Sequence, residues 1–470
     1  MSSSFTDFGL PARLTDVLTS RTIQTPTPIQ RATIPDALTG RDVLGRARTG
    51  SGKTLAFLLP LVARLAGGPR PKPGAPRALI LAPTRELVGQ IDEALQPLAA
   101  AARLTSRTVF GGVGQGPQVS AIRRGVDIVV ACPGRLDDLM RQGHCSLSAV
   151  QITVLDEADH MAALGFLPVV RRLLSRTPAG GQRLLFSATL DRDVDTLVRA
   201  YLSDPARHEA DSAQSPVGTM THHVLHIDRE HRLPVLVDLT SAPGRTVVFT
   251  RTKHGAKALV RQLQRNGVPA AELHGNLSQN ARTRNLDDFR TGRVAALVAT
   301  DIAARGIHVD DVTLVIHADP PADHKAYLHR SGRTARAGGS GTVVTLASTD
   351  QTREVRQLLR AANITAPATR VTSVDHPVLA TIAPGDRVLA DPDTLRPTTR
   401  PGTPASSGPR ASGGGRSESG RPRRRSGRSR GAAPRQRTAA GTEQSGGRTP
   451  TERSGSRTGH SAAAFSARRR

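Results

Sequence analysis

Apolar residues along most of the chain fall into short continuous runs, which alternate with longer segments of helical periodicity. A short run of adjacent Val, Ile, Leu and Ala residues predicts a strand that is covered on both faces, as in a parallel sheet. Parallel strands need helical crossovers, so the alternation predicts an α/β architecture. The predicted strands begin near Asp42, Ala78, Asp127, Ile152 and Arg183 in the first half, and near Thr246, Ala295, Val312 and Gly341 in the second.

A polar segment that contains DSAQSP separates the two sets of strands. We therefore expect a first domain over 1–207, a linker over 208–220 and a second domain over 221–368, each of normal domain size. Beyond Ala368 the periodicity fades, and Pro, Gly, Ser, Thr and Arg dominate. Such a composition cannot bury enough apolar surface to offset its ordering entropy, which predicts a disordered tail over 369–470.

Charge is spread unevenly over the 470 residues, whose formal net charge is +26. The segment 401–470 has 16 arginines, no lysine and three glutamates, so it carries half of that excess. An arginine-rich arm without an apolar face is typical of a polyanion-binding segment more than of a membrane anchor. The alternative is a solubilising extension with no required role.

The remaining composition predicts a cytoplasmic protein. Two cysteines, Cys132 and Cys145, fit a reducing compartment and exclude a disulfide scaffold. The start, MSSSFTDFGL, does not resemble a signal peptide, and the longest apolar stretch, 55–65, is too short to span a bilayer. The segment THHVLHID has an alternating pattern that predicts a strand at the start of the second domain's sheet. We expect structural or solvated roles and no metal site for the histidines in and beside it, which are His222, His223, His226 and His231.

A glycine-rich loop follows the first predicted strand, with an apolar helical run directly after it. Strand, loop and helix in this order predict a phosphate-binding P-loop. Backbone N–H groups and the helix N-terminus would bind phosphate, while Lys53 would reach the β- and γ-phosphates and Thr54 would ligate Mg²⁺. An ordinary turn before a core helix is the alternative. The loop reads Ala47-Arg48-Thr49-Gly50-Ser51-Gly52-Lys53-Thr54, with alanine where the general pattern has its first glycine.

A later strand runs directly into Asp156-Glu157-Ala158-Asp159. Paired carboxylates at the end of a buried strand suit a nucleotide hydrolase. Asp156 would hold Mg²⁺ through its water shell, and Glu157 would position and deprotonate the attacking water. Alone, the tetrapeptide is typical of a solvated helix start. Together with the P-loop, it predicts an enzyme that hydrolyses nucleoside triphosphates.

These motifs and their neighbours resemble the DEAD-box family of ATP-dependent RNA helicases over roughly 5–348. The segment Pro26–Gln30, with Phe5 upstream, is similar to the family's adenine-reading Q motif, in which Gln30 offers a donor and an acceptor to the base. The resemblance implies two tandem RecA-like domains, ATP and Mg²⁺ as cofactors, and RNA as the partner. It also implies an RNA-stimulated ATPase that locally unwinds short duplexes.

Further motifs extend the resemblance through both halves. By resemblance, Ser187, Thr189 and Asp159 couple hydrolysis to strand separation, and Arg333 and Arg336 are arginine fingers for the γ-phosphate. The stretch 274–338 is most similar to the bacterial RhlE-like subgroup. Residues that match the RNA-contacting motifs are Thr84, Arg85, Gly112, Gly134 and Arg135 in the first half, and Arg251, Thr252, Gln279, Arg282 and Thr300 in the second.

The chain departs from the family pattern at two nucleotide-facing positions. Ile23 stands where the family has an aromatic residue that stacks on adenine, and His308 stands where an aspartate is common. The change at Ile23 predicts weaker nucleotide binding, because an aliphatic side chain lacks the stacking geometry. The change at His308 affects a ribose contact that the family pattern implies. Two other functions remain open: an RNA-annealing chaperone that acts through its tail, and a DNA-directed helicase of the wider superfamily.

Overall fold

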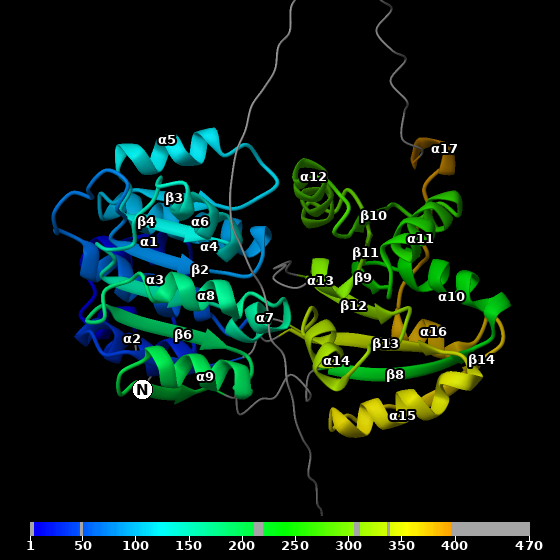
Figure 1. Cartoon of the computed structure of the whole chain (residues 1–470). Helices are drawn as coiled ribbons and strands as arrows, with labels where there is room; N and C mark the ends of the chain where they lie inside the picture. The colour runs from blue at the N-terminus through cyan, green and yellow to red at the C-terminus, as the bar shows by residue number, and fades with distance from the viewer. Residues whose placement is uncertain (1–3, 48–49, 211–219, 305–310, 336–338, 396–470) are drawn as a thin grey trace, which may run out of the picture. The chain divides into compact units, whose positions relative to one another are not determined.

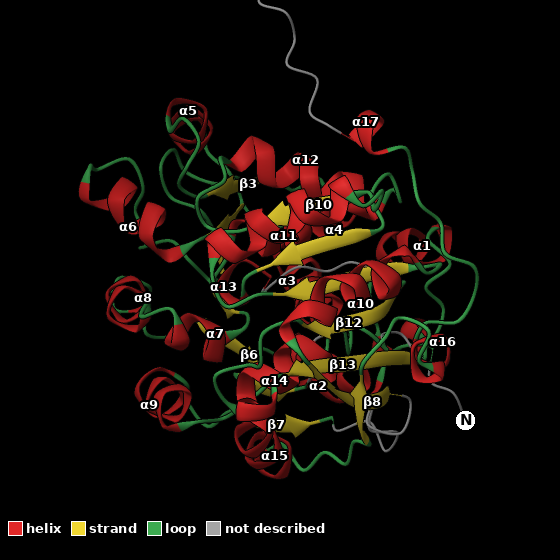
Figure 2. Cartoon of the chain, turned by 90° about the vertical axis from the view of Figure 1, so that its right-hand side faces the viewer, coloured by secondary structure: helices red, strands yellow, loops and turns green. Residues whose placement is uncertain are grey.

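The chain forms two parallel sheets, one in each half. The computed structural model describes residues 4–47, 50–210, 220–304, 311–335 and 339–395. Within these ranges each sheet has seven strands, and every strand pair is parallel. Figure 1 labels the elements along the chain, and Figure 2 shows helices flanking the strands. The α/β class and the tandem RecA-like sheets are confirmed.

The first sheet has the strand order β3-β4-β2-β5-β6-β1-β7. Successive residues of a strand face opposite sides of it, so that Ile80 and Leu79 belong to two separate apolar clusters. The elements are η1 (Phe5–Phe8), α1 (Ala12–Ser20), α2 (Pro28–Thr39), β1 (Val43–Arg46), α3 (Lys53–Leu65), β2 (Ala78–Leu81), α4 (Arg85–Ala101), β3 (Ser106–Val109), α5 (Gly116–Arg124), β4 (Ile128–Ala131), α6 (Pro133–Arg141), β5 (Ile152–Leu155), α7 (Ala158–Ala163), α8 (Leu167–Leu174), β6 (Gln182–Ser187), α9 (Arg192–Tyr201) and β7 (Ala206–Glu209).

The second sheet has the order β10-β11-β9-β12-β13-β8-β14 and is also covered by an apolar cluster on each face. Its elements are β8 (Met220–Ile227), α10 (Arg229–Ser241), β9 (Arg245–Phe249), α11 (Lys253–Arg265), β10 (Ala270–Leu273), α12 (Gln279–Arg290), β11 (Ala296–Ala299), α13 (Asp301–Ala304), β12 (Val312–His317), α14 (His324–Ser331), β13 (Gly341–Ala347), η3 (Thr349–Gln351), α15 (Thr352–Ala361), β14 (Ala368–Val371), α16 (Pro377–Ile382) and α17 (Pro392–Leu395).

The domain boundaries need correction at two places. The linker expected over 208–220 overlaps the ends of β7 and β8, so only 210–219 lies between the strands, and 211–219 lies outside the described residues. The ordered fold also continues past 368, because β14 pairs with β8, and Leu379 and Ile382 of α16 are buried in the second domain's core. Leu379 and Ile382 are three positions apart, as on one face of a helix, but the polar residues around them masked this pattern. The predicted tail from 396 onward lies outside the described residues.

Candidate nucleotide and RNA site

The segments after β1, β5 and β6 all begin at the same edge of the first sheet, because parallel strands end on one side. In the strand order, β5, β6 and β1 are consecutive neighbours. The P-loop follows β1, the DEAD tetrapeptide follows β5, and Ser-Ala-Thr ends β6. Motifs that are far apart in the sequence are thereby brought together by the fold.

Two glycines of the P-loop have a left-handed backbone conformation. Gly50 and Gly52 have φ values of +85° and +91°, which glycine adopts without strain. The Lys53 ammonium is buried and donates a hydrogen bond to the Ala47 carbonyl at 2.7 Å, across the loop. Arg48 and Thr49 lie outside the described residues. One pocket is lined by P-loop residues and by both strand-end carboxylates, among them Gly50, Gly52, Lys53, Thr54, Asp156 and Glu157.

Gln30 connects the Q motif to the P-loop. Its amide nitrogen donates to the Gly52 carbonyl at 2.9 Å, and its amide oxygen accepts from the backbone N–H of Thr27 at 2.8 Å. The second amide hydrogen and the second lone pair keep the capacity for adenine that the sequence predicted. Phe5 is buried in the first domain's core, and Ile23 packs against the same cluster. His308 lies outside the described residues.

Asp156 and Glu157 have opposite electrostatic environments. Burial raises the pKa of Asp156 to about 7, opposed by Lys53 and reinforced by Glu157. Burial would also raise the pKa of Glu157, but the hydrogen bond and charge of His160, with Arg333 and Lys53, lower it to about 2. The Glu157 carboxyl group is thus ionised near neutral pH. Asp156 and Thr54 line the same pocket. A divalent cation fits these oxygen donors, because its charge would favour the ionised form of the buried Asp156 carboxyl group.

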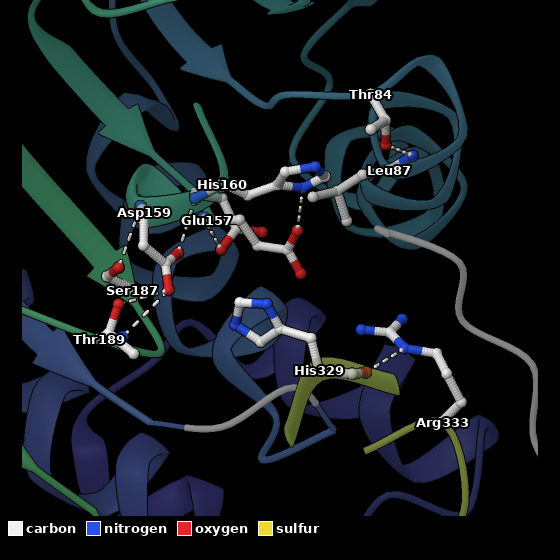
Figure 3. Close-up of polar contacts among 10 residues, drawn as sticks. Thr84, Leu87, Glu157, Asp159, His160, Ser187, Thr189, His329 and Arg333 are labelled. Carbon is white, nitrogen blue, oxygen red and sulfur yellow. Dashed lines mark hydrogen bonds and ion pairs between the residues drawn. The ribbon is translucent and has the colours of Figure 1, made fainter. Parts of the chain in front are cut away.

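Asp159 joins the DEAD tetrapeptide to the Ser-Ala-Thr motif (Figure 3). Its backbone N–H donates to the Ser187 hydroxyl at 3.2 Å. Its carboxylate accepts hydrogen bonds from the backbone N–H and the hydroxyl of Thr189, at 3.1 and 3.0 Å. The segments that follow β5 and β6 are therefore connected by side-chain hydrogen bonds.

Two residues of the first half, the predicted RNA contact Arg85 and its neighbour Glu86, bond to residues of the second. Arg85 donates to the Gln279 amide oxygen at 3.1 Å, and Arg282 donates to Glu86 at 2.7 Å. Gln279 also donates to Glu86, at 3.1 Å. Burial would raise the pKa of Glu86, but Arg282 lowers it below its usual value. The structure thus brings Arg85, Gln279 and Arg282 together around Glu86.

The other predicted RNA contacts lie in loops at strand ends or in helix starts. Gly112 has φ of +79°, which favours glycine, and a Cβ there would lie 1.9 Å from the Arg85 guanidinium, which would have to move. Thr84 and Thr252 cap α4 and α11 by accepting from Leu87 N–H at 3.2 Å and Gly255 N–H at 3.0 Å. The rest are Gly134 and Arg135 in α6, Arg251 after β9 and Thr300 after β11.

The segment 329–336 contains the two predicted arginine fingers, Arg333 and Arg336, and a third arginine, Arg330. Arg333 is buried, and its Nε donates to the His329 carbonyl at 3.2 Å. Its charge also acts on Glu157. Arg336 lies outside the described residues. Arg330 pairs with both carboxylate oxygens of Asp301 and lies over the Phe249 ring, 5.1 Å from its centroid.

Sequence reasoning missed three partners of the predicted residues. Glu86 anchors Arg282, Asp301 pairs with Arg330, and His160 bonds to Glu157. Glu86 and Asp301 directly follow the predicted RNA contacts Arg85 and Thr300, so an acidic residue beside these positions was an available signal. His160 could have been found from its i,i+3 spacing to Glu157, which places both on one face of a helix.

Three of the four histidines around β8 contact other protein groups. His222 Nδ1 lies 2.8 Å from the Tyr327 hydroxyl, His226 Nδ1 lies 3.3 Å from the Thr352 hydroxyl, and His231 pairs with Glu230. Burial raises the pKa of Cys132 and of Cys145 to about 12, so neither thiol is a ready nucleophile. None of the helices in the described part of the chain is both long and apolar enough to cross a bilayer.

A P-loop at the end of β1, a carboxylate pair at the end of β5 and a second parallel sheet are the features of a two-domain P-loop nucleotide-binding protein. Residues 27–197 match the family described as DEAD/DEAH box helicase, and residues 228–338 match the helicase conserved C-terminal domain. The chain belongs to the DEAD-box helicase family.

Relatives and solved structures agree with this assignment. The chain is 39% identical over 361 residues to DEAD-box ATP-dependent RNA helicase 30 of Arabidopsis thaliana, covering 76% of this chain and 61% of that protein. It is 40% identical over 350 residues to the ATP-dependent RNA helicase RhlB of Erwinia tasmaniensis, covering 73% of this chain and 81% of that protein. The fold is similar to S. cerevisiae Dbp5 bound to RNA and ADP BeF3, with a TM-score of 0.71 and 28% identity over 81% of this chain and 99% of that one.

Proposed function

We propose that this protein is an RNA-stimulated ATPase that locally unwinds short RNA duplexes. The observation that carries the proposal is a single pocket that brings Lys53 and Thr54 of the P-loop together with Asp156 and Glu157. Phosphate-binding groups and an ionised base in one pocket suit hydrolysis of a terminal phosphate. The relative named as Dbp5 was solved with RNA and ADP BeF3, which supports the same substrate and partner here.

Each group of site residues has a separate role in ATP hydrolysis. The P-loop backbone and Lys53 bind the phosphates, and Gln30 reads the adenine edge. Glu157 accepts a proton from the attacking water, since its carboxylate is ionised. Arg333 and Arg336 place positive charge beside the negative charge that develops on the transferred phosphoryl group. Thr54 and Asp156 fit Mg²⁺, which when bound would neutralise charge on the phosphate oxygens.

RNA binding would involve the residues of both halves that match the family's RNA motifs. Contacts to sugar and phosphate make such binding tolerant of sequence, and the 2′-OH distinguishes RNA from DNA. Arg85, Gln279 and Arg282 already lie together, with Glu86 as their counter-charge. RNA and ATP that favour the same arrangement of the two domains would each strengthen the other's binding.

The finer assignments are also proposals. We place the chain near the RhlE-like bacterial subgroup on the stretch 274–338, and in the cytoplasm on its cysteine usage. The arginine-rich segment 401–470 would tether RNA non-specifically, with affinity that falls steeply as salt is raised.

Strand displacement from a short labelled RNA duplex tests the proposal. The full-length protein should release the strand with ATP and not without it, and Glu157→Gln should bind RNA yet release nothing. A chain that ends at Arg400 should keep the activity. Loss of displacement in that truncation would favour the annealing chaperone, and equal displacement from DNA duplexes would favour the DNA-directed helicase.

A further inference from the structure

The carboxylate of Glu157 has a side-chain partner one helical turn away. His160 Nδ1 lies 3.2 Å from Glu157 Oε2, as Figure 3 shows. The two side chains are only 4% and 12% exposed, so water does not compete freely for this hydrogen bond. Residues at i and i+3 face each other on a helix, and α7 begins directly after Glu157.

The other ring nitrogen of His160 supports a dedicated pairing. Nε2 is buried and has no hydrogen-bond partner among the described residues. Buried polar groups in proteins are nearly always paired, because an unpaired one costs free energy. A histidine that only filled space here would carry this cost with no compensating interaction. The hydrogen bond between Nδ1 and Glu157 is the interaction that compensates for the unpaired Nε2.

Glu157 needs orientation because its own backbone does not supply it. The residue caps α7 with φ of +50° and ψ of +53°, a left-handed conformation uncommon outside glycine. Its side chain has three rotatable bonds, which leave the carboxylate free to turn. A general base must lie about 2.6–3.2 Å from the proton that it removes. A donor that holds Oε2 leaves Oε1 for the attacking water.

We propose that His160 is a positioning residue for ATP hydrolysis: its Nδ1–H donates to Glu157 Oε2 and orients the carboxylate toward the water that attacks the γ-phosphate. The inference rests on the proposed role of Glu157 as the base. In this arrangement His160 orients the base, Glu157, which in turn activates the attacking water. His160 touches neither ATP nor water in this scheme and acts only through Glu157.

Two substitutions separate positioning from packing. His160→Leu keeps a similar bulk without a donor, whereas His160→Asn places an amide nitrogen at the same number of bonds from the backbone as Nδ1. We expect His160→Leu to lower kcat of RNA-stimulated ATP hydrolysis by about tenfold, with KM for ATP unchanged, because orientation acts on the chemical step. His160→Asn should keep kcat within about threefold.

Met161→Leu is the matched control, since Met161 is a fully buried residue of the same helix, and it should keep wild-type kcat and KM. Equal kcat losses in the Leu and Asn variants, or no loss in either, would overturn the proposal. If His160→Leu fails to fold, the ¹⁵N spectrum of the wild-type imidazole decides, because an unprotonated Nδ1 would overturn it and a protonated Nδ1 would support it. Turnover that survives in Glu157→Gln would instead refute the proposed function itself.

Discussion

Thr189 donates two hydrogen bonds to one oxygen of Asp159, from its backbone N–H at 3.1 Å and from its hydroxyl at 3.0 Å. Thr189 follows β6, and Asp159 lies in the helix that follows β5. A change at the catalytic carboxylates can therefore reach the Ser-Ala-Thr segment through one side-chain contact. The neighbouring Ser187 hydroxyl, which accepts from Asp159 N–H, adds a second link.

Removing the Thr189 hydroxyl should separate hydrolysis from unwinding. In Thr189→Ala the hydroxyl bond is lost, a change of about 1 kcal/mol, while Glu157 and the P-loop stay in place. We expect RNA-stimulated ATP turnover within about threefold of wild type and duplex displacement lowered by about tenfold. Thr189→Ser, which keeps the hydroxyl, should behave as wild type. A parallel fall of turnover and displacement in Thr189→Ala would contradict this role.

The segment after β14 should be required for the stability of the second domain. Arg387 donates to both carboxylate oxygens of Asp238, at 2.8 and 2.9 Å, and Leu379 and Ile382 are buried in the core. Burial of two such side chains contributes roughly 3–5 kcal/mol. A chain that ends at Val371 should therefore unfold at a clearly lower temperature than the full-length protein.

The control is a chain that ends at Leu395, which keeps α16 and the Arg387–Asp238 pair. Its thermal unfolding should match that of the full-length protein. Equal unfolding temperatures for the chains that end at Val371 and Leu395 would show that the segment adds no stability and that the earlier boundary was adequate.

The second domain should lose stability in mild acid. Burial, with a contribution from His223, lowers the pKa of His222 to about 4. Burial, with Arg330 and His222, lowers the pKa of His317 well below its usual value. Since the unfolded chain binds protons near pH 6.5 and the folded chain does not, stability is full above about pH 6.5 and falls toward pH 4.

His222→Asn tests this pH dependence. Asparagine can still accept a hydrogen bond from the Tyr327 hydroxyl, which lies 2.8 Å from His222 Nδ1, and it does not titrate. The drop in unfolding temperature between pH 7.5 and 5.5 should be smaller in the variant than in wild type. An unchanged drop would mean that His222 is not among the groups responsible.

The strands that the sequence did not predict are all at sheet edges. β3 and β7 end the first sheet, and β10 and β14 end the second. Central strands such as β2 are buried on both faces and read as continuous apolar runs, whereas β7 and β14 have mostly exposed or half-buried residues. An edge strand lacks a neighbouring strand on one side and tolerates polar residues. Its sequence therefore does not show the continuous apolar run by which the central strands were predicted.

The nucleotide motifs were predictable because each is a continuous stretch at a strand end, such as Lys53–Thr54 and Asp156–Glu157. Contacts between motifs could not be predicted in this way. The Arg282–Glu86 and Gln30–Gly52 hydrogen bonds join segments that are far apart in the sequence, and only the fold determines which of them become neighbours. The opposite pKa directions of Asp156 and Glu157 also depend on burial and neighbours, which sequence alone does not provide.

The most direct test of the central claim is ATP turnover by the full-length protein with and without single-stranded RNA, beside Glu157→Gln. Strong stimulation by RNA that disappears in Glu157→Gln is the predicted result, because the ionised Glu157 carboxylate lies in the pocket lined by the P-loop. Turnover that does not respond to RNA, or that persists in Glu157→Gln, would contradict the account.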